Sequence, residues 1–222
     1  MRIMKPRYFV FVASVLASLH VGQAIAAEPV PSLTSAELAQ GPYSSMHMLL
    51  EKTFLNIDVL TVDVRFGKSV QARLTELAKG KAYSDALGKQ VATVAIGADD
   101  ALVQLKFLRD ISLDQWMDGV RDNLKQAREA GLITAKVQTR VSAGLANWFS
   151  AVKERGYKKG DRLLYRVQPS SLRTVVVAAD GKIFVDKLDR GSEAPHVVMS
   201  SYFAPDSDFR ELLLKSLFKP SS

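Results

Sequence analysis

The chain has 222 residues, no cysteine, 47% hydrophobic residues and a formal charge of +7. Removing the three cations near its start lowers that charge to +4, and the remaining Lys and Arg residues alternate with Asp and Glu. A nucleic-acid binder would instead show a basic stripe, so this composition argues against a nucleic-acid partner. Without cysteine the chain cannot form disulfides, and it is long enough for one hydrophobic core.

The first 26 residues have the pattern of a secretory signal. An apolar run over residues 8–21 is shorter than the roughly 20 residues that span a bilayer, and small residues occupy positions 24 and 26. We expect cleavage after Ala26, which leaves no membrane span. Since an export signal occurs here without cysteine, we expect a Gram-negative periplasmic location. The cations before the apolar run are Arg2, Lys5 and Arg7.

A flexible arm is expected over residues 27–42, which hold three prolines and little apolar periodicity. A single domain is expected over residues 43–222. Its first part, residues 52–66, alternates polar and apolar side chains in the manner of strands. Two short helices are predicted over residues 69–78 and 83–95.

A further strand is predicted over residues 101–107, followed by the best-defined helix of the chain. Ser112 and Gln115 form a capping box, in which each side chain accepts a backbone N–H at the helix start. Gly131 is expected to end this helix. A second amphipathic helix is predicted over residues 135–155. The buried side of the first helix is expected to contain Leu113, Trp116, Met117, Val120, Leu124 and Ala127.

Three strands are predicted in the last third, over residues 162–168, 172–179 and 182–188. Asp180-Gly181 between the second and third is a strong hairpin signal. An apolar segment at 196–203, without an assigned type, precedes a last helix expected to bury Phe209, Leu212, Leu213 and Leu217. This order predicts an α+β fold with helices on one face of an antiparallel sheet.

Standard catalytic and metal-binding signatures are absent from the sequence. The expected mature chain has two histidines, His47 and His196, which makes a His-rich metal site improbable. Gly67-Lys68-Ser69 imitates the end of a phosphate-binding loop, but Val62 stands where the leading glycine is required. No cofactor and no metal are expected.

The pair Arg109-Asp110 lies between a predicted strand and a capped helix. Arg109 could anchor a carboxylate ligand through its guanidinium group, or the pair could tie down the junction by local bonds, which is the interpretation we favour. Trp116 and Trp148 could line an apolar cavity, although aromatic residues at helical spacing are more often core. Asn123 lies near the boundary of the polar helix face, where an asparagine is ordinarily solvated.

Several segments together resemble the chalcone isomerase-like domain found in exported bacterial proteins. They are LVQLKFLRDISLDQWMDGVRDNL, NWFSAV, KKGDRLLYRV, ADGK and SYFAPDSDFRELLLKSL, and the resemblance covers about residues 46–218. It implies an open-faced β-sandwich of the chalcone isomerase type, whose antiparallel sheet is covered on one face by helices above an apolar cleft. Plant relatives of this fold divide into flavanone-forming isomerases and noncatalytic fatty-acid binders.

The catalytic residues of the plant isomerases carry over poorly. If Asn123 matches their asparagine, Trp116 stands at the tyrosine position and Lys106 is the nearest lysine. The expected arginine would fall near Met46 and His47, where none occurs. The resemblance therefore implies a noncatalytic protein rather than an intramolecular lyase.

Two functional classes remain open from the sequence. One is a carrier or sensor of a small, fatty-acid-like amphipathic ligand, with candidate ligand-binding residues Lys106, Arg109, Trp116 and Asn123. The other is an envelope scaffold, with an unidentified protein partner, whose cleft is filled by Trp116, Met117, Trp148 and Phe149. We favour the ligand slightly.

Overall fold

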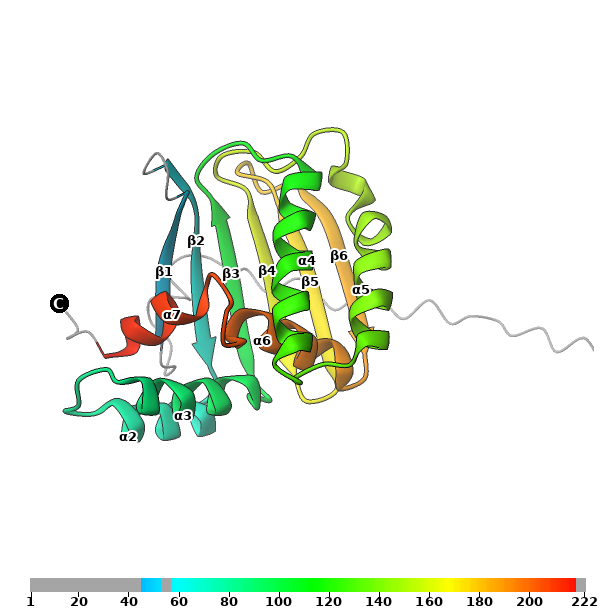
Figure 1. The fold of residues 1–222 in the computed structure, drawn as a ribbon. Coiled ribbons are helices and arrows are strands. Elements are labelled where there is room, and N and C mark those ends of the chain that lie inside the picture. Colours follow the sequence, from blue (N-terminus) through cyan, green and yellow to red (C-terminus); the bar gives the residue numbers. More distant parts are fainter. Residues whose placement is uncertain (1–44, 53–56, 219–222) are drawn as a thin grey trace, which may run out of the picture.

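The computed structural model describes residues 45–52 and 57–218, which form a six-stranded sheet and its helices (Figure 1). The expected signal, arm and cleavage position lie outside the described residues. The strands are β1 (Ser45–Lys52), β2 (Ile57–Phe66), β3 (Ala101–Phe107), β4 (Arg162–Gln168), β5 (Ser171–Val177) and β6 (Ile183–Arg190). The helices are α2 (Lys68–Ala78), α3 (Asp85–Ile96), α4 (Leu113–Glu129), α5 (Ala135–Trp148), the 3-10 turn η1 (Ser150–Val152), α6 (Glu193–Phe203) and α7 (Arg210–Leu217).

The strands lie side by side in chain order, β1-β2-β3-β4-β5-β6, and every neighbouring pair is antiparallel. Because side chains alternate across a strand, the pairing register fixes two faces. The inner face, toward the helices, carries large apolar side chains such as Val64, Val103 and Tyr165, which are paired across β2, β3 and β4. The opposite face holds a separate small apolar cluster of Leu164, Val175 and Val177.

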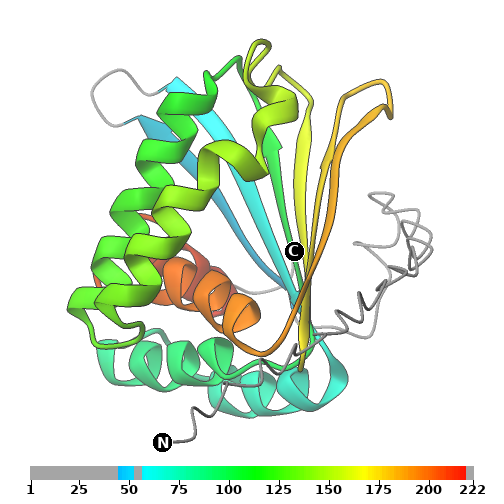
Figure 2. The same ribbon diagram turned by 90° about the vertical axis from the view of Figure 1, so that its right-hand side faces the viewer.

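The helices cover one face of the sheet, and Figure 2 shows this layer edge-on. Helix α4 runs along the sheet beside α5 (Figures 1 and 2). Helices α6 and α7 lie on the same face toward one end of the sheet, and α2 and α3 cover that end. The main hydrophobic core fills the space between the two layers and includes Phe66, Phe107, Met199 and Leu213. The predicted α+β architecture, with an antiparallel sheet covered on one face by helices, is confirmed.

Local sequence signals account for several element boundaries. The Ser112 hydroxyl accepts the Gln115 amide at 3.1 Å, and the Gln115 side chain accepts the Ser112 amide at 3.1 Å, which confirms the capping box. Gly131 follows α4 with a φ of 71°. Gly181 turns the β5–β6 hairpin with a φ of 90°, and Ala178 and Lys182 are bonded across that turn.

Two parts of the sequence prediction are wrong, the end of the second amphipathic helix and the burial of Leu212, and one segment without an assigned type is a helix. The second amphipathic helix does not continue to residue 155: α5 ends at Trp148, because the chain turns at Phe149 (φ −108°) and buries both Phe149 and Val152. The apolar segment 196–203 is part of helix α6. Leu212 is 46% exposed, since α7 packs against β1 and α3 through Leu213 and its neighbour Leu214.

Sequence reasoning also missed the separate strand β1. Its inner-face residues Met46 and Met48 are buried against β2, where they pair with Val64 and Val62. The predicted strand region began only at residue 52, because the alternation in β1 is carried by methionines rather than β-branched residues.

Candidate functional site: a cavity beneath β6

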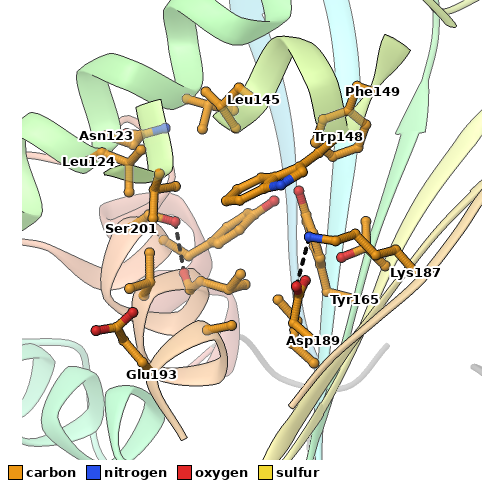
Figure 3. A pocket seen from close by; sticks show the side chains of 18 of the residues that line it. Asn123, Leu124, Leu145, Trp148, Phe149, Tyr165, Lys187, Asp189, Glu193 and Ser201 are labelled. Atoms are coloured by element: carbon orange, nitrogen blue, oxygen red, sulfur yellow. Dashed lines mark hydrogen bonds and ion pairs between the residues drawn. The ribbon is translucent and has the colours of Figure 1, made fainter. Parts of the chain in front are cut away.

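An apolar cavity of about 260 Å³ lies between the inner face of β4–β6 and helices α4, α5 and α6. We call it the β6 cavity, and Figure 3 shows it from close by. Its apolar walls come from all three helices and from the sheet, so they depend on contacts between residues far apart in the chain. They comprise Val120, Leu124, Val141, Leu145, Trp148, Phe149, Leu172, Val185, Ala194, Val197, Val198 and Phe209.

Trp148 is the largest of these side chains and points from the end of α5 into the cavity (Figure 3). Its position depends on Gly144, one helical turn earlier. A Cβ atom on Gly144 would stand 2.6 Å from the Trp148 ring. The absence of that atom leaves room for the indole ring close to its own helix, at one wall of the cavity.

A few hydroxyl groups interrupt the apolar lining. Thr174 and Ser201 border the cavity, as do Tyr165 and Tyr202. Burial raises the pKa of Tyr165 and of Tyr202 above the ordinary value for a phenol. Both hydroxyls therefore stay protonated at neutral pH and can donate hydrogen bonds to a bound molecule.

Charged side chains gather where the cavity reaches the surface. Arg140 of α5 pairs with Glu193 of α6. Lys187 of β6 pairs with Asp189 on the same strand at 2.7 Å, and its ammonium lies 4.1 Å from the centre of the Trp148 indole ring. The mouth of the β6 cavity is thus polar while its interior is apolar.

A second, wider hollow of about 1050 Å³ lies on the other side of α4, between that helix, α7 and strands β1–β3. We call it the β1 cleft. It is separated from the β6 cavity by four residues that line both spaces, Val120, Asn123, Tyr202 and Phe209. Tyr202 and Phe209 stack with their ring centres 5.0 Å apart.

Asn123 belongs to this shared wall. It is buried, and its side-chain oxygen accepts a hydrogen bond from the Ser207 hydroxyl at 3.1 Å. The expectation of a solvated asparagine is therefore wrong. The loop after α6 folds over the helix boundary and places Ser207 there, which no local signal in α4 reveals.

The structure brings three of the four sequence-predicted site residues together. Arg109, Trp116 and Asn123 all line the β1 cleft, and Asn123 also lines the β6 cavity. Lys106 is exposed and lines neither space. It pairs with Thr61 and Arg162 on the sheet face away from the helices.

Trp116 is core, as expected for an aromatic at helical spacing. It is buried and meets Phe149 edge-on, with ring centres 4.5 Å apart, and it also lies against Tyr157. Trp148, in contrast, is only partly buried and borders the cavity. Both tryptophans therefore border a hollow, Trp116 as a buried core residue beside the β1 cleft and Trp148 as a partly buried residue of the β6 cavity.

Asp110, the acidic residue of the Arg109-Asp110 pair, joins two segments of the chain. Asp110 accepts the Lys159 amide at 3.0 Å and the Lys158 ammonium at 2.9 Å, which joins the segment after β3 to the one before β4. These bonds lower the pKa of Asp110 below its ordinary value, that to Lys158 contributing most. Arg109 is exposed at the edge of the β1 cleft.

The chain resembles solved structures rather than known sequences. No family model matches the chain, and no curated protein sequence matches it. Among solved structures, the Arabidopsis thaliana fatty-acid binding protein is similar, with a TM-score of 0.49 and 12% identity over 79% of this chain and 86% of that one. This likeness is too distant to identify a ligand. The functional assignment therefore depends on the cavity itself.

The described residues contain neither a metal centre nor a membrane span. No three His, Asp or Glu side chains among them come together as metal ligands would. Likewise, none of the helices α2–α7 is long and apolar enough to cross a bilayer.

Sequence reasoning missed the charged residues at the mouth of the β6 cavity. Counting pairs from the Gly181 turn would not have found them, because the register of β5 and β6 shifts between Val176 and Val177. This shift places Lys187 opposite Thr174 and Asp189 opposite Leu172, both on the inner face. Charged residues on the face that covers the core are unusual.

Proposed function

We propose that this protein binds one small amphipathic ligand, with the apolar part of the ligand in the β6 cavity, and acts as its carrier or sensor without transforming it. The observation that carries this proposal is the apolar space between the sheet and helices α4–α6, with hydroxyl groups in its lining and charged side chains at its mouth. Protein interiors are normally packed as densely as organic crystals. An apolar pocket with a few convergent polar groups is the usual form of a small-molecule site.

The size and chemistry of the cavity favour a slender ligand. Its volume of about 260 Å³ is slightly below the roughly 300–1,000 Å³ typical of ligand pockets. A single acyl-like chain, in contact with Leu145, Val185 and Val197, suits this space better than a multi-ring compound does. The hydroxyl of Tyr165 offers a hydrogen bond to an oxygen atom of such a ligand. The Ser201 hydroxyl already donates to the Val198 carbonyl at 2.8 Å and can accept a hydrogen bond from a ligand.

The scaffold alternative requires a filled cleft. Closing the space would need Trp148 to be fully buried, as the neighbouring Phe149 is. Trp148 instead borders an open volume and supports the lysine at its mouth. This arrangement favours ligand binding over a purely structural role.

Native mass spectrometry of protein purified without detergent, followed by lipid extraction, tests the proposal. We expect a stoichiometric small amphiphile, or saturable binding of an added fatty acid. A protein that carries no ligand and fails to bind added fatty acids would contradict the proposed function.

The two tryptophans provide a test of location. Ligand binding should change the fluorescence of Trp148, so the response should persist in Trp116→Phe and disappear in Trp148→Phe. Trp116 is the matched control because it lies in the core beside the β1 cleft. A response carried by Trp116 alone would place the ligand in that cleft instead.

We also propose that the protein is exported to the periplasm after cleavage between Ala26 and Ala27. The support is the pattern of cations, apolar run and small residues in the first 26 positions. N-terminal sequencing of the protein in an osmotic-shock fraction should begin at Ala27. Recovery of an intact Met1 in the membrane pellet would contradict export.

A further inference from the structure

The two edges of the sheet differ in what covers them. At the β1 edge, the His47 backbone amide donates to the Ser216 hydroxyl at 2.9 Å, and α7 packs against that strand. In the described part of the chain, β6 is the outermost strand at the other edge and pairs with β5 alone (Figure 1). An open edge presents N–H and C=O groups that can pair with another chain. Strand β6 is therefore the edge at which the sheet can be extended.

The backbone groups on the open side of β6 follow from its pairing with β5. Just beyond the last facing pair, the Gly191 amide donates to the Ser170 carbonyl at 2.7 Å. Since hydrogen-bonded and non-bonded pairs alternate along an antiparallel ladder, the backbone groups of Asp186, Leu188 and Arg190 point away from β5. The side chains of these three residues are exposed, on the sheet face away from the helices.

The charged residues of β6 are arranged about Leu188 in a self-complementary order. Asp186 and Lys187 precede it, and Asp189 and Arg190 follow it. If two copies of β6 pair antiparallel about a two-fold axis at Leu188, each Asp186 faces Arg190 of the second copy. Each Lys187 then faces Asp189 of the second copy. Opposite charges directly across two strands stabilise their pairing.

Neighbouring registers lack this complementarity. Facing side chains must lie on the same face of the sheet, so the axis of an antiparallel pair of identical strands passes through one residue. An axis at any of the four charged positions brings a side chain against its own copy, and like charges directly opposite are destabilising. An axis at Leu188 instead brings together two leucines, each 39% exposed in a single chain. Charge and apolar contact thus select one register.

We propose that two copies of this chain associate through β6 with the two-fold axis at Leu188, which joins their sheets into one. Such a contact is closed, because each copy uses the same surface. Lys187 borders the β6 cavity, so Asp189 of the second copy contributes a charge to the mouth of that cavity. The paired segment is short, so the association depends on protein concentration. This inference goes beyond the proposed function and needs no ligand.

Sedimentation velocity of the purified protein over a range of concentrations tests the association. We expect the mass to rise from that of one chain to that of two. Leu188→Lys should raise the dissociation constant by about tenfold or more, because it removes the apolar contact and places two ammonium groups at the axis. Ile183→Lys is the matched control, since Ile183 is 46% exposed on the same strand but lies outside the paired segment. It should associate as the unmodified protein does.

A disulfide tests the register itself, because the chain has no cysteine of its own. In Leu188→Cys, the two thiols face each other across the axis. Facing Cα atoms of a hydrogen-bonded pair are about 5.5 Å apart, which a disulfide can bridge. Mild oxidation should therefore link two copies. In Ile183→Cys, the same register holds the two Cα atoms on the order of 30 Å apart, so no link should form.

Three outcomes would overturn this inference and leave the ligand-binding proposal untouched. They are a protein that stays monomeric at every concentration, equal weakening of association in Leu188→Lys and Ile183→Lys, and equal cross-linking of the two cysteine variants. Circular dichroism and thermal melting of each variant show that it is folded, so that a loss of association reports on the β6 contact.

Discussion

Replacing Ala194 with leucine should stabilise the free protein. Ala194 lines the β6 cavity from α6 and is partly buried against the core. Leucine adds three carbon atoms, which at about 0.8 kcal/mol each contribute roughly 2.4 kcal/mol when buried. Fixing the longer side chain costs about 0.5–1 kcal/mol in rotamer entropy. The net gain of about 1.5 kcal/mol should raise the melting temperature by about 3–6 °C in a chain of this size.

The same substitution should weaken ligand binding at least tenfold (about 1.4 kcal/mol), because the new side chain occupies the space of the ligand tail. Calorimetric melting of the free protein and titration with decanoate measure the two effects. Ala143→Leu, at an exposed position of α5, is the matched control and should change neither by much. A destabilised Ala194→Leu protein that binds as tightly as the unmodified one would refute the assignment of the cavity.

Three further predictions concern the helix, the core and catalysis. Gly144→Ala should weaken decanoate binding by driving the Trp148 ring into the cavity. The control is Gly119→Ala, whose added Cβ meets nothing within 4 Å and which should leave binding unchanged. Titration of both variants with decanoate measures the difference. Asp161→Ala should lower the free energy of unfolding, measured in urea, by about 3 kcal/mol, because this buried carboxylate pairs with an arginine and accepts two backbone amides. Asp110→Ala, at an exposed carboxylate, should lower it far less. Equal losses in the two variants would contradict this reasoning. The protein is expected not to accelerate chalcone cyclisation above the uncatalysed rate, because the sequence resemblance leaves Trp116 where an isomerase would need a tyrosine. A stereoselective acceleration in an assay with a chalcone would disprove this.

The sequence predicted elements whose signals are local. The capping box at Ser112, the apolar stripe of α4 and the Asp180-Gly181 turn each depend on residues within a few positions of one another. Helix α6 was missed as a helix because its apolar residues lack a clear helical period: it is buried by α4, α3 and β5 rather than half exposed. Packing against these neighbours makes this segment a helix, and a single sequence does not show that packing.

The candidate site was predicted less well than the fold. Arg109, Trp116 and Asn123 do share one hollow, because the strand-to-helix segment that contains them was recognised correctly. Lys106 was placed there by proximity in the chain, although strand alternation puts it on the other face, one residue from the inward Leu105. Predicting the charged mouth requires both the register of β6 and the contact between α5 and α6, so no single sequence motif could reveal it.

Strand β6 stands at an edge of the sheet, and this position affects how the cavity can open. Among the described strands, β6 is bonded to β5 alone, and its Ile183 and Leu188 side chains are 46% and 39% exposed. An edge strand can separate by breaking one ladder of hydrogen bonds, while the opening of a central strand breaks two. A ligand that enters beside β6 therefore exchanges through local fraying at the rim, and the buried strands β3 and β4 need not move.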